Sequence, residues 1–133
     1  IWVLVDRPDE TPEHFETIGR MIDAIGIDWD RAALVSRLAW PQTGEPTAAL
    51  LARFAPVLDR LATLAPPRLV LALGQTAAEI AGDAARMVSS RGRWFDWRGA
   101  RLLPSVHPRV FQGNRELRRQ VFDHLKIFQA GLA

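Results

Sequence analysis

The segment RLVLALG, residues 68–74, constrains the fold of this chain more than any other. Pro66 and Pro67 precede it and end any helix there, and its apolar residues run without interruption to Gly74. A short, continuously apolar run indicates a strand buried on both faces, as in parallel sheets. Thr76 then opens a short helical pattern. A strand that turns directly into a helix is the unit from which parallel α/β sheets are built.

Two more apolar runs, each followed by a helical pattern, precede this segment. Residues 1–6, IWVLVD, and 32–40, AALVSRLAW, are predicted strands. A helix is predicted over 11–25, because a capping threonine is followed by proline and glutamate. A second, longer helix begins near Pro46, and Pro56 inside it predicts a kink. Its apolar spacing predicts one buried face, made of Leu50, Phe54, Val57, Leu58, Leu61 and Leu64.

The second half of the chain continues the alternation of strands and helices. Residues 93–106 are predicted to form two strands around a turn at Arg98 and Gly99. Asn114 can cap a final helix. The apolar side of that helix is predicted to contain Leu117, Val121, Phe122, Leu125 and Phe128. The alternation predicts a single domain over residues 1–133, a parallel-centred α/β sandwich.

The composition excludes several classes of site. The chain contains no cysteine, so it has no disulfide, no cysteine nucleophile and no thiolate ligand for a metal or an iron–sulfur cluster. Three histidines in 133 residues are weak support for a metal site. No apolar run approaches the roughly 20 residues of a membrane span, and the first residues lack the basic lead of a signal peptide. We therefore expect a soluble, cytoplasmic protein with no cofactor and no membrane partner.

Charge is distributed unevenly along the chain. Residues 1–82 contain 7 basic and 11 acidic side chains, a net charge of −4, whereas residues 83–133 contain 10 basic and 4 acidic ones, a net charge of +6. A basic second half is compatible with a polyanionic partner such as DNA. A solvated surface with unequal halves accounts for it equally well.

The motifs of the second half occur in an order that is similar to a known family. LVLALGQTAAEIAG is followed by RGRWFDWRGARLLPSVHPRVFQGNRELRRQVFDHLKIF. Together they resemble the strand–glycine–helix segment, the RGR-led hairpin, the histidine–proline motif and the closing helix of the uracil-DNA glycosylase superfamily, most closely its iron–sulfur family 4. The resemblance implies a three-layer α/β/α sandwich around a central, mainly parallel four-stranded sheet.

The resemblance also implies positions for a catalytic site. Enzymes of this superfamily flip a nucleotide into a pocket, and a histidine stabilises the anionic uracil that leaves. His107 falls on that histidine, and Asp6 falls on the family's carboxylate. Both glycines of the carboxylate loop are replaced, by Val5 and Asp9, which should narrow or reshape a pocket. Because of these losses, Asp6 can also be read as a residue that merely ends a strand.

Other positions depart further from the family pattern. The asparagine that reads uracil falls at Ser36, whose single hydroxyl cannot replace an amide's paired donor and acceptor. The segment that brings the stacking phenylalanine is missing. Two cysteines of the iron–sulfur cluster fall at Trp40 and Phe54. We therefore expect apolar packing where the family holds its cluster.

Several candidate residues leave two interpretations open. His107 serves either a base pocket or a turn held by a backbone hydrogen bond. Phe111, beside Val110, either intercalates into DNA as a wedge or packs in the core. Four arginines near the hairpin and the histidine–proline turn either hold DNA phosphates or belong to a solvated face: Arg91, Arg93, Arg109 and Arg115. The remaining histidines, His14 and His124, are expected at the surface.

Two functions are compatible with these observations. In the first, the chain is a non-catalytic module of this fold in bacterial DNA replication or repair, nucleoid-associated and in contact with DNA or protein partners. It would then be similar to the psi subunit of DNA polymerase III, which bridges the clamp loader and the chi subunit. In the second, it is a divergent glycosylase that uses Asp6 and His107 to excise uracil or a damaged base. Joint loss of several catalytic groups favours the first, since one oxyanion donor alone contributes about 100- to 1,000-fold.

Overall fold

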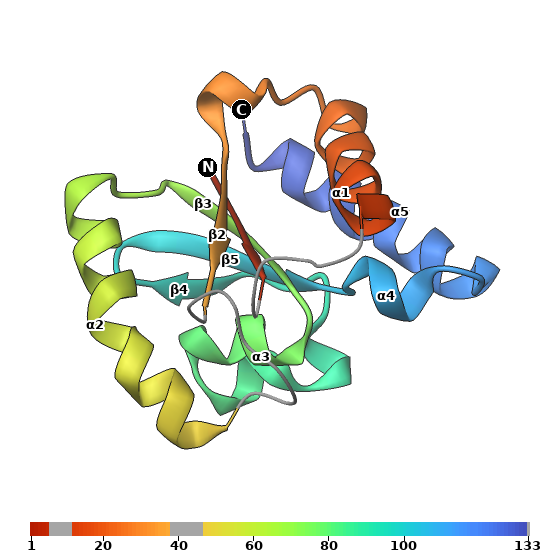
Figure 1. Ribbon diagram of the computed structural model, residues 1–133. Coiled ribbons are helices and arrows are strands. Elements are labelled where there is room, and N and C mark those ends of the chain that lie inside the picture. The colour runs from red at the N-terminus through yellow and green to blue at the C-terminus, as the bar shows by residue number, and fades with distance from the viewer. Residues whose placement is uncertain (6–11, 38–46, 133) are drawn as a thin grey trace.

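A computed structural model describes residues 1–5, 12–37 and 47–132 of the chain (Figure 1). Asp6 and Trp40, which carry predictions from the sequence, lie outside these ranges. The helices are α1 (Pro12–Ala24), α2 (Ala48–Leu64), α3 (Gln75–Ala78), α4 (Pro108–Phe111) and α5 (Arg115–Ala130), with short 3-10 turns at Trp29–Arg31, Glu79–Ala81, Asp83–Arg86 and Val88–Ser90. Among these described helices, none combines the length and apolar character needed to cross a bilayer.

The strands form one sheet in the order β2-β1-β3-β5-β4. They are β1 (Trp2–Val5), β2 (Ala33–Ser36), β3 (Leu69–Leu73), β4 (Phe95–Trp97) and β5 (Ala100–Ser105). The first four in this spatial order are parallel, and β4 pairs antiparallel with β5 at the edge. The sheet has five strands rather than four, because both arms of the predicted hairpin join it. Arg98 and Gly99 at its turn both have positive φ, 49° and 80°, as a tight two-residue hairpin requires.

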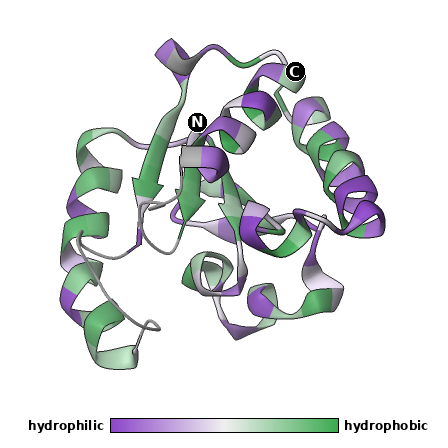
Figure 2. Ribbon diagram, turned by 45° about the vertical axis from the view of Figure 1, so that its right-hand side comes forward, coloured by the Kyte–Doolittle hydropathy of each residue, from purple (hydrophilic) through white to green (hydrophobic). Residues whose placement is uncertain are grey.

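The two faces of the sheet bury separate apolar clusters, which makes the fold a three-layer sandwich (Figures 1 and 2). Side chains alternate across each strand, so Val3 and Val5 point to one face while Trp2 and Leu4 point to the other. α1 and α5 cover the first face and α2 and α3 cover the second. Figure 2 shows the strands as the most apolar part of the molecule. The predicted α/β/α architecture is confirmed.

Two helices present faces that differ from those predicted. α2 continues through Pro56 and buries Leu58 and Ala62, whereas three residues of its predicted buried face are exposed: Val57, Leu61 and Leu64. On α5, Phe122 is exposed, although Val121, Leu125 and Phe128 are buried as expected. On both helices the apolar stripe is wider than the surface that contacts the sheet. Only the residues that meet the sheet are buried, and the others remain exposed.

Candidate functional site

Four parallel strands end together at one edge of the sheet. The register aligns Val5 with Ser36 and with Leu73, and Leu73 with Ser105. Open α/β sheets bind ligands beyond the carboxyl ends of their strands. Ser36 and Ser105 lie three strand spacings apart along this edge, which corresponds to about 14 Å. Because His107 follows β5 by two residues, the sheet brings Ser36 and His107 to the same edge.

His107 is buried at that edge and begins helix α4. Its side chain is 1% exposed. The Nδ1 atom accepts a hydrogen bond of 3.1 Å from the backbone N–H of Arg109, and Pro108 takes the first helical position. A ring nitrogen that accepts a hydrogen bond carries no proton, so in the neutral ring the proton lies on Nε2. The Nε2 atom is also buried.

His14 of α1 packs directly against His107. The two ring centroids lie 5.6 Å apart and the ring planes meet at 89°, an edge-to-face contact. His14 is therefore partly buried rather than at the surface, where the sequence predicted it. The expectation was wrong because α1 packs against α4 and turns this residue toward His107. The position of the family histidine is thus covered by an imidazole from another element.

The third histidine joins α5 to the sheet. His124 Nδ1 and Ser105 Oγ share a hydrogen bond of 2.9 Å. Burial lowers the pKa of His124, and the positive charge of Arg91 lowers it further, while Asp123 opposes both. Gly92 makes room for this ring, since a Cβ at Gly92 would lie 2.7 Å from His124 Cδ2. His124 is therefore partly buried, not a free surface residue, which corrects the prediction.

Protonation of His124 is expected to weaken the folded state. The pKa of its imidazole is about 6.5 in an unfolded chain and lower in the folded one. The contribution to stability is therefore complete above about pH 6.5 and is lost as the pH falls through the lowered folded value. We expect the melting temperature to fall between pH 7.5 and 5 in the wild type and to fall less in His124→Gln. Equal decreases in both proteins would show that other groups cause the loss.

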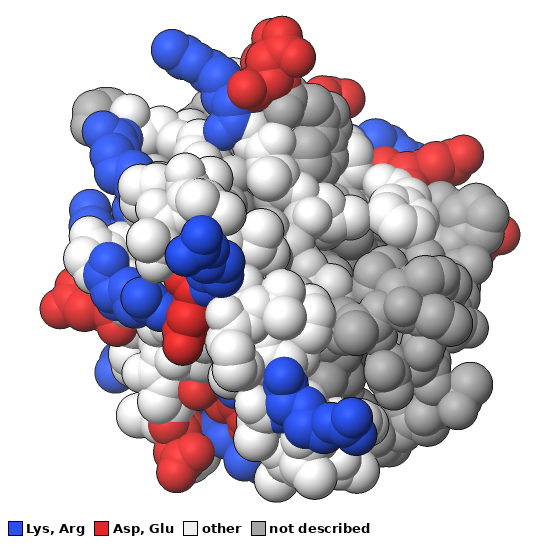
Figure 3. Space-filling model, turned by 60° about the vertical axis from the view of Figure 1, so that its left-hand side comes forward, with Lys and Arg blue, Asp and Glu red and all other residues white. Residues whose placement is uncertain are grey.

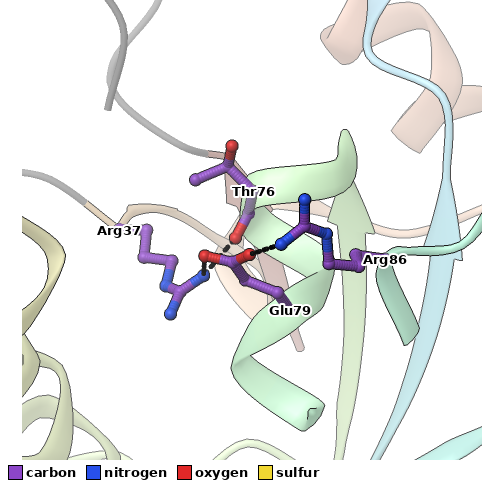
Figure 4. Close-up of polar contacts among 4 residues, drawn as sticks. All are labelled: Arg37, Thr76, Glu79 and Arg86. Carbon is purple, nitrogen blue, oxygen red and sulfur yellow. Dashed lines mark hydrogen bonds and ion pairs between the residues drawn. The ribbon is translucent and has the colours of Figure 1, made fainter. Parts of the chain in front are cut away.

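A network of three charged side chains lies where β2 ends (Figure 4). Arg37 follows Ser36 and donates to Glu79 Oε1 at 2.9 Å and to the carbonyl oxygen of Thr76. Glu79 Oε2 accepts from Arg86 at 3.3 Å. The side chains of Arg37 and Glu79 are only 15% and 19% exposed. Burial lowers the pKa of Arg37, and Glu79 opposes this shift.

Arg37 is a residue at this edge that was not predicted from the sequence. Its signal was present, because a single arginine interrupts the apolar run AALVSRLAW. A cation inside a strand pattern must find a partner if it is buried. The network places a compensated positive charge beside the base-recognition candidate Ser36.

The predicted DNA-contacting arginines are spread over several elements. Arg93, Arg109 and Arg115 are exposed, and Arg91 is partly buried near His124. Arg109 lies on α4 and Arg115 begins α5. Arg93 and Arg115 are therefore exposed to solvent where a phosphate could reach them.

Phe111 packs in the core instead of projecting as a wedge. It is 5% exposed and belongs to the cluster on the α1 and α5 face. It also lines a cavity of about 360 Å³ between α1 and the turn after α4, together with Thr17 and Gln112. Its neighbour Val110 is the exposed residue of the pair. The structure thus supports the packing interpretation of Phe111, because α4 turns this side chain toward α1.

α5 carries an exposed stripe of basic residues interrupted by one aromatic ring. Arg115, Arg119, Phe122 and Lys126 recur at spacings of four, three and four, which places them on one face of the helix. Phe122 is 52% exposed, and Lys126 Nζ lies 4.7 Å from the centroid of its ring. This α5 basic stripe is not evident from the sequence, because the apolar periodicity assigns Phe122 to the core. An exposed ring among cations can stack on a base while its neighbours hold phosphates.

Comparison with known families agrees with this architecture. The model of the family described as the uracil DNA glycosylase superfamily matches residues 9–126. The match includes Ser36, His107 and the basic stripe of α5, whereas Asp6 precedes it. It covers most of the 133 residues, and the mainly parallel sheet between helical layers fits it. The chain therefore belongs to the uracil DNA glycosylase superfamily.

Proposed function

We propose that this chain is a non-catalytic module of the superfamily that acts in DNA replication or repair. The observation that carries the proposal is the burial of His107 against the ring of His14. A histidine that stabilises a leaving uracil must touch the base. Here His107 is buried, and the ring of His14 packs against it. Ser36 supports the same conclusion, because a hydroxyl reads a base edge less specifically than an amide does.

The residues do not fit an iron–sulfur cluster, and we propose that the chain binds no cofactor. A cluster of the family type needs cysteine thiolates, and the chain has no cysteine. Phe54 stands at one of the two cysteine positions and packs against the cluster of apolar residues under α2. Apolar contact supplies there the packing that a metal cluster would otherwise provide.

The α5 basic stripe supports a role in contact with DNA. Arg115, Arg119 and Lys126 can neutralise successive phosphates, and Phe122 can stack on an unpaired base. Arg109 extends the exposed positive charge onto α4. Single-stranded DNA suits this arrangement better than duplex, because only an unpaired base offers its face to an exposed ring. Such a surface requires no active site.

Protein partners from replication or repair fit the same proposal. A non-catalytic module of this fold acts by binding other proteins, as the psi subunit does when it bridges the clamp loader and the chi subunit. A DNA-binding face on α5 leaves the opposite side of the sheet, covered by α2 and α3, available for protein contacts. We therefore propose a bridging role of the psi type.

One observation favours a second candidate, a divergent glycosylase. The hydrogen bond from Arg109 to Nδ1 leaves the proton of His107 on Nε2, the tautomer that can donate to an anionic base. His107 thus keeps the tautomer, protonated on Nε2, that excision requires. Excision would then depend on opening the contact between α1 and α4.

The two candidates are separated by a direct assay. Purified protein is incubated with single- and double-stranded oligonucleotides that contain uracil, and alkali-labile abasic sites are measured. We expect no sites above background, because His107 is enclosed and Ser36 replaces the base reader. His14→Ala, which removes the ring that packs against His107 and keeps His107 itself, is the matched control. Turnover in the wild type that His107→Ala abolishes would establish the glycosylase.

A further inference from the structure

The exposed face of α2 carries an apolar stripe that no described element covers. Val57, Leu61 and Leu64 are 44%, 39% and 67% exposed. Their spacing of four and three residues places them on one side of the helix. Phe54, one turn earlier on the same side, is partly buried against the core. Grouped, exposed apolar side chains of this kind mark interaction sites more often than solvated surface.

Two arginines border this α2 apolar stripe on the side away from the core. Arg53 and Arg60 are exposed, and neither takes part in an ion pair among the described residues. The acidic residue of this part of α2, Asp59, projects elsewhere and pairs with Arg98 of the β4–β5 turn. The side chains by which α2 itself borders the stripe on this side are therefore cationic. Figure 3, in which the left-hand side of Figure 1 comes forward, shows uncharged surface between basic side chains, with acidic side chains also on this face.

We propose that the α2 apolar stripe docks a partner helix that is amphipathic and acidic. A ridge with residues at i, i+4 and i+7 matches the apolar ridge of another helix. Arg53 and Arg60 are seven residues apart, about two turns or 10.5 Å along the axis. The partner therefore places acidic side chains about two turns apart beside its own apolar ridge, so that each meets one arginine.

The same charges argue against the other occupants. A second copy of this chain would bring its own Arg53 and Arg60 to the border, and like charges facing each other disfavour that pairing. DNA would meet the two arginines but would leave Leu61 and Leu64 against a charged backbone. Only an apolar ridge with an acidic border satisfies both features of the surface.

Selection from a library of helical peptides tests this inference. The library displays 18-residue helices with fixed leucines at i, i+4 and i+7 and random flanking positions. Binders selected on the wild type, after removal of those that bind Leu61→Glu, are expected to carry Asp or Glu at flanking positions two turns apart. A selected peptide is expected to bind Arg53→Glu/Arg60→Glu about tenfold more weakly. Replacing its acids by lysine is expected to restore binding to that double variant.

The control is Arg115→Glu/Arg119→Glu, which makes the same change of net charge on α5 and is expected to keep peptide binding. The inference would be overturned if no peptide bound or if the binders showed no preference for acidic residues. It would also be overturned if the lysine-substituted peptide failed to bind the Arg53→Glu/Arg60→Glu variant. A concentration-dependent dimer that Leu61→Glu dissociates would assign the stripe to a second copy and would overturn it too. Melting curves of each variant confirm that it is folded. None of these outcomes depends on whether the protein binds DNA or excises uracil.

Discussion

Arg115→Glu/Arg119→Glu is expected to lower the affinity for a single-stranded oligonucleotide by about 100-fold at low salt, because two phosphate contacts are lost and replaced by repulsion. Both residues lie on the exposed stripe of α5. Neither forms an ion pair among the described residues, so we expect the substitutions to leave the fold intact. Each lost contact on single-stranded DNA also reduces the salt dependence, by about 0.7 in the slope of log K against log salt. Fluorescence anisotropy at several salt concentrations measures both quantities.

The matched control for this prediction is Arg53→Glu/Arg60→Glu on α2, which makes the same change in net charge. We expect it to change DNA affinity less than threefold, because α2 covers the other face of the sheet. Phe122→Ala then separates stacking from charge. Loss of the stacking contact with a base is expected to weaken the binding free energy by about 1–3 kcal/mol and to leave the slope of log K against log salt unchanged. Equal losses in both double variants would show that net charge alone, and not the α5 basic stripe, causes binding.

The strands and the layer order could be predicted because their signals are local. The run 68–74 is apolar without interruption, and Arg98 and Gly99 form a turn whose positive φ angles suit glycine. Alternation of such strands with helices leaves few topologies other than a parallel-centred sandwich. Asn114 caps α5 as predicted, since its side chain accepts a hydrogen bond from Leu117 N.

The exposed helix faces could not be predicted in the same way. Periodicity indicates which residues share a side of a helix, but not how much of that side meets the sheet. Phe122 and Leu61 belong to apolar stripes, and the position of each helix over the sheet leaves them outside the contact. These are the residues on which both proposed surfaces rest. The sequence thus shows that these helices carry many apolar residues, but only the structure shows which of them remain exposed.

The arrangement of the histidines also depends on contacts between distant segments. The sequence allows His107 to serve either a base pocket or a turn held by a backbone hydrogen bond, and its Nδ1 atom does accept such a bond. Sequence spacing contains no information on the approach of His14, 93 positions earlier, or on the contact of His124 with Ser105. Arg37 and Glu79 likewise meet across 42 positions. The edge of the sheet is assembled from four strands, so its chemistry is a property of the fold.

Glu79→Ala is expected to destabilise the fold by about 2–3 kcal/mol, because it leaves the largely buried cation of Arg37 without its carboxylate. The effect lies below the 3–5 kcal/mol of fully buried pairs, since water still reaches part of both side chains. Arg37 keeps the carbonyl oxygen of Thr76 as an acceptor, and this limits the loss further. Urea denaturation followed by circular dichroism measures the change in the free energy of unfolding.

Removing both charges of this pair separates the cost of an orphaned cation from the value of the contact. Arg37→Met/Glu79→Leu fills a similar volume with apolar atoms, and we expect it to be more stable than Glu79→Ala, since no buried charge is left without a partner. Arg86→Ala removes the more exposed cation and is expected to cost less than about 1 kcal/mol. A double variant less stable than Glu79→Ala would contradict this expectation. It would show that the hydrogen bonds and ion pairs of the network stabilise the end of β2. In that case the charge at this edge, and not only the packing beneath it, would hold Ser36 in place beside β1.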